Sequence, residues 1–243
     1  MLHEQALAIS PFPGRQQPVI AIIGSDGSGK STVGEALYKE MSHERPTKLC
    51  HLGKQAGNLG RSLRKVPFFG KILEKRNIKE HEALKHRKES STLAVLVAFV
   101  MSMRRVYRFY RMRCYHKRGF AILTDRYPQT LIPGPMDGPA LADLSFKGYF
   151  LHGLMKLENS LYNRMTKFQP DLVIRLNVDL ETALARKPDH QPRKLARKIS
   201  DVGRLYFGTT PILDLSATDP LDKVLAQARK AVYEVMSAYP VKH

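Results

Sequence analysis

The sequence predicts an α/β fold in which a five-stranded parallel sheet is flanked by helices, and three observations lead to this prediction. Short apolar runs typical of buried strands alternate along the chain with longer segments typical of helices. A glycine-rich loop stands between the first such run and the first helical segment. The chain has 243 residues and 43% hydrophobic content, which suits one large domain. We therefore expect a single domain over residues 18–243, preceded by a loose arm of residues 1–17.

The first strand and the loop after it form the most specific motif. Residues 19–23 are apolar and predict a buried strand, and residues 33–40 predict a helix. The loop GSDGSGKST between them has the context that a P-loop requires. Its glycines let backbone N–H groups point inward, and the helix N-terminus adds positive potential, so we expect it to bind a nucleoside triphosphate. The expected nucleotide-binding residues are Gly24, Ser25, Asp26, Gly27, Ser28, Gly29, Lys30, Ser31 and Thr32.

Two residues of this loop have the side chains that phosphoryl transfer needs. Lys30 is expected to reach the outer phosphates as a catalytic residue, and the Ser31 hydroxyl is expected to ligate Mg²⁺. ATP and Mg²⁺ are therefore the predicted cofactors.

The next part of the chain predicts a short strand over 48–52, then a loop over 53–70 and a charged segment over 71–90 that is a surface helix or a flexible excursion. Residues 92–117 predict a long helix that ends at Gly119. Its first half is apolar nearly all round, which predicts burial.

The second half of this long helix interleaves arginines with aromatic residues. Such interleaving is compatible with stacking on nucleic-acid bases. The alternative is an amphipathic helix whose core stripe has helical spacing, and we favour it. The residues of that stripe are Val106, Phe109, Tyr110 and Cys114.

A third strand, predicted over 120–124, ends at a charged tripeptide. Ligands of open α/β sheets bind beyond the carboxyl ends of the strands. Asp125 is expected to bind Mg²⁺ through water or to accept the proton of the attacking group, and its alternative role is a strand-end cap or salt bridge. Arg126 is expected to grip an acceptor phosphate, and its alternative role is an ion pair with a carboxylate. A Pro- and Gly-rich loop over 128–143 is expected to cover the site.

The last third of the chain continues the alternation. Asp179 is a predicted helix N-cap after the fourth strand. The basic segment 186–199 is a predicted lid that would place an arginine on the transferring group, with a solvated basic helix as the alternative. The remaining expected elements are helices over 150–165 and 219–238 and strands over 172–178 and 211–215.

The formal net charge of +18 indicates an anionic partner, namely a phosphorylated substrate, nucleic acid or a membrane surface. Residues 54–118 carry most of it, with 18 Lys and Arg against 4 Asp and Glu, although such a run is also typical of a solvated face. The two cysteines lack metal spacing, no histidine pair suits zinc, and no segment predicts a signal peptide or a membrane span. We expect a cytoplasmic protein, and a homodimer is compatible with the sequence.

Several of these segments together resemble the thymidylate kinase family of P-loop nucleoside monophosphate kinases. The similar segments are the loop 24–32, the Asp-Arg-Tyr tripeptide 125–127, the strand and lid entry 170–186, and the last strand 213–217. The resemblance implies a three-layer P-loop NTPase fold with a helical lid, and transfer of the γ-phosphoryl group of ATP to a nucleoside monophosphate.

The resemblance also implies roles for individual residues. Asp26, Arg104, Arg126 and Tyr127 fall at positions that contact the acceptor in that family. The catalytic lid arginine would be Arg186, Arg193 or Arg197, of which we select Arg193.

Two segments depart from the family pattern, and both are on the acceptor side. Residues 51–57 read HLGKQAG where the family usually carries an Arg-Glu-Pro-Gly-Gly-Thr-like segment, and 128–138 lack the Tyr-Gln pair that reads thymine. We therefore expect an ATP-dependent kinase for a nucleotide or similar small anionic acceptor, and we do not expect dTMP as that acceptor. The alternative is a P-loop ATPase or kinase that acts on nucleic acid or at an anionic membrane through the basic region.

Overall fold

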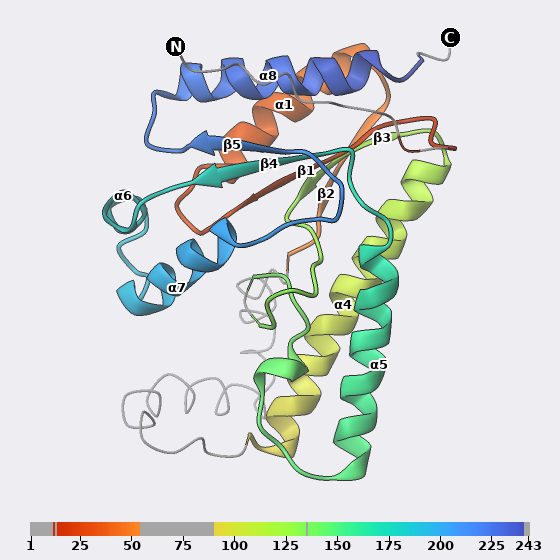
Figure 1. Ribbon diagram of the computed structural model, residues 1–243, viewed down its shortest axis with the longest axis vertical. Coiled ribbons are helices and arrows are strands. Elements are labelled where there is room, and N and C mark those ends of the chain that lie inside the picture. Colours follow the sequence, from red (N-terminus) through yellow and green to blue (C-terminus); the bar gives the residue numbers. More distant parts are fainter. Residues whose placement is uncertain (1–11, 13, 54–89, 135, 241–243) are drawn as a thin grey trace, which may run out of the picture.

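A computed structural model describes residues 12, 14–53, 90–134 and 136–240 (Figure 1). Its centre is a five-stranded parallel sheet in the order β2-β3-β1-β4-β5. The strands are β1 (Val19–Gly24), β2 (Thr47–His51), β3 (Ala121–Asp125), β4 (Leu172–Asn177) and β5 (Ile212–Ser216). The predicted fold class and the five predicted strands are confirmed.

Helices cover both faces of the sheet, which gives three layers (Figure 1). Because side chains alternate along a strand, Ile20 and Ile22 pack against one helical layer, and Ala21 and Ile23 pack against the other. The first layer contains α1 (Lys30–Glu44) and α8 (Leu221–Ser237), and the second contains α4 (Thr92–Lys117) and α5 (Tyr149–Thr166). Beyond the carboxyl end of β4 lie α6 (Leu180–Arg186) and α7 (Pro192–Gly203).

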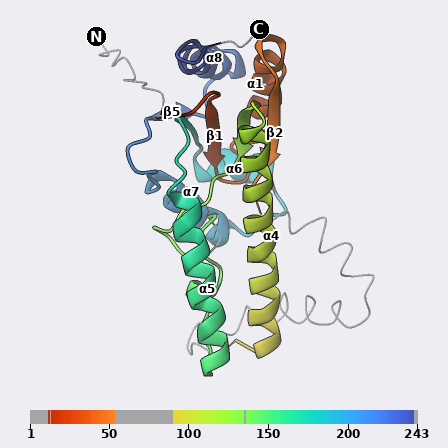
Figure 2. The same ribbon diagram turned by 90° about the vertical axis from the view of Figure 1, so that its right-hand side faces the viewer.

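Helices α4 and α5 run side by side away from the sheet (Figure 2). A small apolar cluster of Val95, Leu141 and Leu151 joins them to the short helix η1 (Leu141–Asp143). The predicted burial of the first half of α4 is wrong, because Val100 is 57% exposed and only one stripe of this half is covered by α5 and η1.

The core stripe in the second half of α4 also needs a correction. Val106 and Phe109 are buried as predicted, but Tyr110 is 43% exposed and Cys114 is exposed. The buried stripe lies on a different side of the helix, and it contains Arg105 and Met112 in place of Tyr110 and Cys114.

The described part of the predicted loose arm packs on the domain. Gln17 is buried and accepts a hydrogen bond from Arg45. Arg15 donates to Asp171 with an N–O distance of 3.0 Å. Residues 1–11, 13, 54–89, 135 and 241–243 lie outside the described residues, and so do the loop predicted over 53–70, except Gly53, and the segment predicted over 71–90, except Ser90. Within the described chain, no helix combines the length and apolar character needed to cross a membrane.

Candidate active site

The P-loop is a tight turn between β1 and α1. Gly27 and Gly29 have φ values of 83° and 80°, a conformation that side-chain-bearing residues rarely adopt. A Cβ atom on Gly27 would lie 2.9 Å from the carbonyl oxygen of Ala183, so the loop passes close to α6. The first turn of α1 contains Lys30, Ser31 and Thr32, and the N–H groups of a helical first turn have no intrahelical partner. The loop therefore presents backbone donors suited to phosphate oxygens.

Lys30 lies within this loop and is folded back on it. Its ammonium group donates to the carbonyl oxygen of Ser25. Burial, together with repulsion from Arg126, lowers the pKa of Lys30 to about 8, although Asp125 and Asp26 act in the opposite direction. A bound phosphate would add negative charge beside this buried ammonium group and stabilise its charged form.

Asp125 lies at the carboxyl end of β3, where the sheet register places it beside Ile22 of β1 and His51 of β2. Its Oδ2 atom is 3.4 Å from Nδ1 of His51. Its Oδ1 atom is buried and has no hydrogen-bond partner among the described residues. A buried acceptor without a partner is unfavourable, so this oxygen suits a water-bearing Mg²⁺ ion.

The donor set therefore fits the expected cation. Ser31 lies in the first turn of α1 and is exposed, so its hydroxyl is available as a second oxygen ligand. Mg²⁺ usually takes one or two protein oxygens together with water and substrate phosphates. The described residues contain no group of three or more His, Cys, Asp or Glu side chains arranged for a metal ion.

Arg126 is the centre of a network of ion pairs on the other side of the loop. Its Nη2 atom is 3.1 Å from Oδ1 of Asp26, and its Nη1 atom is 3.5 Å from Oδ2 of Asp137. Arg105 is 2.7 Å from the other oxygen of Asp137. The proximity of Asp137, opposed by burial and aided by Asp26, raises the pKa of Arg126. Arg126 thus forms the ion pair that was its alternative role, and it does so beside the P-loop.

Asp26 connects this network to α7. Its Oδ2 atom is 2.5 Å from the Lys198 ammonium group and 3.6 Å from Nε2 of His190. Burial raises the pKa of Asp26, but the hydrogen bond and charge of Lys198, with Arg126 and Lys30, outweigh burial and lower it to about 2. The carboxylate is therefore ionised and ties the P-loop to α7.

The basic segment 186–199 forms the end of α6, a connecting loop and the first part of α7. Arg186 donates to the carbonyl oxygens of Gly27 and Ala217, at 3.1 and 2.9 Å. Arg197 forms exposed ion pairs with Asp143 and Asp201. Arg193 is exposed on α7, so the structure brings Arg186 to the loop and leaves Arg193 at the surface.

Tyr127 and Arg104 are two of the residues expected on the acceptor side. Tyr127 is only 2% exposed, its ring packs on Phe109 and Phe207, and its hydroxyl donates to the carbonyl oxygen of Phe168. The structure therefore places Tyr127 in the core, where it positions the chain after Arg126. Arg104 is partly buried on α4, and its Nη1 atom has no hydrogen-bond partner among the described residues.

Three residues of the site are absent from the sequence-based set, namely Arg105, Asp137 and Lys198. Arg105 falls in the buried stripe of α4, one turn before Phe109, and a buried arginine needs polar partners. The helical spacing between Arg105 and Phe109 was therefore the sequence feature that could have identified Arg105 as buried. Asp137 is in an irregular loop, where no periodicity indicates which way a side chain points.

The fold and the loop together define a P-loop NTPase fold. No family model matches the chain. Two proteins of Escherichia coli strain K12 are similar to it over nearly their whole length. "Uncharacterized ATP-binding protein YghS" is 37% identical over 224 residues, which are 90% of this chain and 94% of that protein. "Uncharacterized ATP-binding protein YghR" is 32% identical over 226 residues, 92% of this chain and 90% of that protein. The chain belongs to the family of these two proteins.

A solved structure of deoxyadenosine kinase from M. mycoides with bound dATP aligns with 89% of this chain and 100% of its own, at 16% identity and a TM-score of 0.49. A second one with bound dCTP aligns at 14% identity and a TM-score of 0.46. The fold assignment depends on the sheet order and the P-loop.

Proposed function

We propose that the chain is an ATP-dependent phosphotransferase that transfers a γ-phosphoryl group to a nucleoside monophosphate or a similar small anionic acceptor. The observation that carries the proposal is the position of Asp26 between two cationic sites. On one side is Lys30 of the P-loop, and on the other is Arg126, held by Asp137. The printed names of the two relatives, both called ATP-binding proteins, support the nucleotide half.

The donor half follows from the P-loop. Its backbone N–H groups and Lys30 would hold the phosphates of ATP, and Ser31 and Asp125 would hold Mg²⁺. When bound, Mg²⁺ neutralises charge on the transferring group. Asp125 is also close enough to the loop to act electrostatically on Lys30. Either it holds a metal-bound water or it accepts the proton of the attacking group, and its unpartnered Oδ1 atom serves both.

The acceptor half is built on Arg126. Its guanidinium group is shared between Asp26 and Asp137, and an acceptor phosphate would compete with Asp26 for it. Arg104 has an unpartnered buried Nη1 atom and is a second candidate contact. That dTMP is not the acceptor stays a prediction, as does the choice of Arg193 as the catalytic lid arginine.

The direct test is ADP production from ATP and Mg²⁺ with a panel of phosphate acceptors, nucleoside monophosphates first. We expect one acceptor class to raise ADP formation above the rate without acceptor. Lys30→Ala should lower that rate on the order of a hundredfold or more, because the variant lacks the positive charge that would contact the transferring phosphate. Lys39→Ala, an exposed lysine on the same helix, should leave it unchanged. A protein that binds no ATP at millimolar concentration would contradict the proposal.

One observation favours a second candidate, binding of single-stranded nucleic acid. Tyr107 and Tyr110 are 65% and 43% exposed on α4, and Arg111, the residue after Tyr110, is exposed too. Exposed aromatic rings beside arginine suit base stacking on a charged surface. We expect an oligonucleotide to bind at low salt and to lose affinity steeply as salt rises. Loss of binding in Tyr107→Ala would support this candidate, and no binding at low salt would exclude it.

A further inference from the structure

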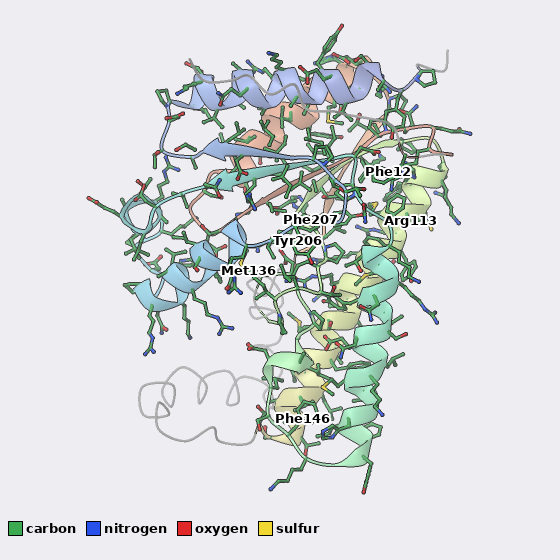
Figure 3. The ribbon with its side chains drawn as sticks, viewed as in Figure 1. Phe12, Arg113, Met136, Phe146, Tyr206 and Phe207 are labelled. Carbon is green, nitrogen blue, oxygen red and sulfur yellow. The ribbon has the colours of Figure 1, made fainter. Side chains whose placement is uncertain are left out.

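A cavity of about 500 Å³ lies at the end of the sheet opposite the P-loop. Its walls come from the N-terminal segment, the C-terminal turns of α4 and the connection before β4. The lining side chains that matter are Phe12, Arg15, Arg113, His116, Lys117 and Phe168. Figure 3 shows Phe12 and Arg113 together near the C-terminal end of α4, well away from Met136 of the loop that covers the active site.

Two guanidinium groups lie over the aromatic ring of Phe168. The central carbon of Arg113 is 3.6 Å from the ring centroid, and that of Arg15 is 4.1 Å from it. Arg15 also lies 4.4 Å from the ring of Phe12. The rings attract both cations, but the two cations repel each other, and Arg15 lowers the pKa of Arg113 in addition to burial.

The carboxylate nearest to this cluster is already occupied. Asp171 is buried, and one of its oxygens accepts from Arg15 at 3.0 Å and from the backbone N–H of Val19 at 2.7 Å. The other oxygen accepts from the Tyr239 hydroxyl at 2.6 Å. Asp171 therefore compensates Arg15, and none of its hydrogen bonds within the described residues comes from Arg113.

Arg113 is consequently under-compensated. Its Nε atom is buried and lacks a hydrogen-bond partner within the described part of the chain. Lys117 adds positive charge to the same cavity. Burial lowers the pKa of His116, whose Nε2 atom is 2.8 Å from the carbonyl oxygen of Gln17. A stacked guanidinium with unused donors is a strong site for a phosphate group, which it binds through paired hydrogen bonds.

We propose that this cavity is a second ligand site, separate from the P-loop, that binds a small phosphate-bearing molecule through Arg113. The volume exceeds that of a bare ion, and the rings of Phe12 and Phe168 offer an apolar wall for the rest of the ligand. The proposal is independent of the proposed kinase activity, because none of the lining residues belongs to the P-loop or to the network around Arg126.

The site also has a structural connection to the active site. The carbonyl oxygen of Phe168 accepts the hydrogen bond of the Tyr127 hydroxyl, and Tyr127 directly follows Arg126.

The test is calorimetric titration with inorganic pyrophosphate, which needs no base recognition. In Lys30→Ala, where the P-loop is weakened, we expect one remaining site. Adding Arg113→Gln should weaken that site at least about tenfold, since hydrogen bonds to charged groups are strong. Lys117→Gln, at an exposed wall residue, should weaken it to a smaller extent. Arg111→Gln removes the same charge from an exposed position of α4 outside the cavity and should have no effect.

A second measurement locates the bound pyrophosphate. The ring-proton NMR signals of His116 should shift when pyrophosphate is added to the Lys30→Ala variant. Equal weakening by Arg111→Gln and Arg113→Gln would show general charge attraction and overturn the proposal. Loss of all pyrophosphate binding in Lys30→Ala alone would do the same. Vesicles with phosphatidic acid test whether the phosphate belongs to a lipid, and Arg113-dependent binding to vesicles without binding of pyrophosphate would overturn the assignment to a small molecule.

Discussion

At the scale of single residues, two backbone outliers mark the site. Arg126 and Asp137 have φ values of 71° and 68°, and both are non-glycine residues. Such conformations cost about 1–3 kcal/mol each and persist where the surroundings hold them. Here Arg126 and Asp137 form an ion pair with each other, and Arg105 forms a second ion pair with Asp137. Arg105 is itself held by three further hydrogen bonds, which it donates to Leu52, Tyr162 and Gly138.

The sequence could identify Arg126, because a charged residue past a buried strand lies at the ligand edge of a parallel sheet. It could not identify Asp137. The path of a Pro- and Gly-rich loop is set by tertiary contacts, such as the side chain of Gln129 bonded to the backbone of Ile132 and Met136. Those contacts have no periodic signature in the sequence.

Asp137→Asn tests the buried pair with little backbone disturbance, because asparagine accepts a positive φ. We expect the free energy of unfolding to fall by about 3 kcal/mol, since the buried Arg105 charge loses its carboxylate. The measurement is the urea unfolding midpoint and slope. The matched control is Asp143→Asn, whose partner Arg197 is 56% exposed, and it should change stability by less than about 1 kcal/mol. Equal effects of the two variants would refute the structural role of Asp137.

Lys30 gives a pH prediction. Its pKa of about 8 in the free protein means that it loses its charge as pH rises through 8, because burial disfavours the ammonium form. A bound phosphate favours the charged form, so the dissociation constant of ATP should be flat below pH 8 and rise up to about tenfold per unit above it. The measurement is ATP binding between pH 6.5 and 9.5 (about the range where Lys30 changes charge). Lys30→Arg keeps its charge throughout and should show no such rise, and an identical rise in that variant would count against Lys30 as its source.

At the scale of elements, the lid is the informative case. The basic composition of 186–199 predicted a lid, and helices α6 and α7 lie there, next to the P-loop. The composition did not distinguish among its cations. Helical geometry does so in retrospect, because Lys198 lies one turn from Leu195 and Val202, the residues of α7 that face the core. Arg193 lies off that stripe and is exposed.

Lys198→Met should loosen α7 without changing its helical character. The ion pair with Asp26 is partly buried and links α7 to the P-loop, so its loss should speed hydrogen exchange of the α7 amides. Exchange measured by mass spectrometry over α7, relative to α8, is the readout. Arg193→Met removes a cation from the same helix at an exposed position and should leave the exchange unchanged. A similar acceleration in both variants would mean that general charge, rather than the Asp26 pair, holds α7.

At the scale of the whole molecule, the sheet and the two long helices α4 and α5 were predictable, but the exposure of the first half of α4 was not. The three inner strands β1, β3 and β4 are largely buried on both faces and mostly apolar, so they were visible in the sequence. The first half of α4 is equally apolar, yet Val100 is exposed, because α4 and α5 run away from the sheet (Figure 2) and α5 and η1 cover one stripe of this half. Apolar composition indicates what a segment can bury, and the neighbouring elements decide how much of it is buried.

The two proposed ligand sites lie at opposite ends of this sheet, so they should stabilise the fold separately. ATP at a hundred times its dissociation constant should add about 2.7 kcal/mol to the free energy of unfolding, because it binds the folded chain alone. Urea titrations with and without ATP and Mg²⁺ measure this increment. Lys30→Ala should lose it at the same ATP concentration, whereas Arg113→Gln should keep it, since Arg113 lies at the far cavity. If Lys30→Ala kept the full increment and Arg113→Gln lost it, ATP would bind at the far cavity, and the P-loop would not be the donor site.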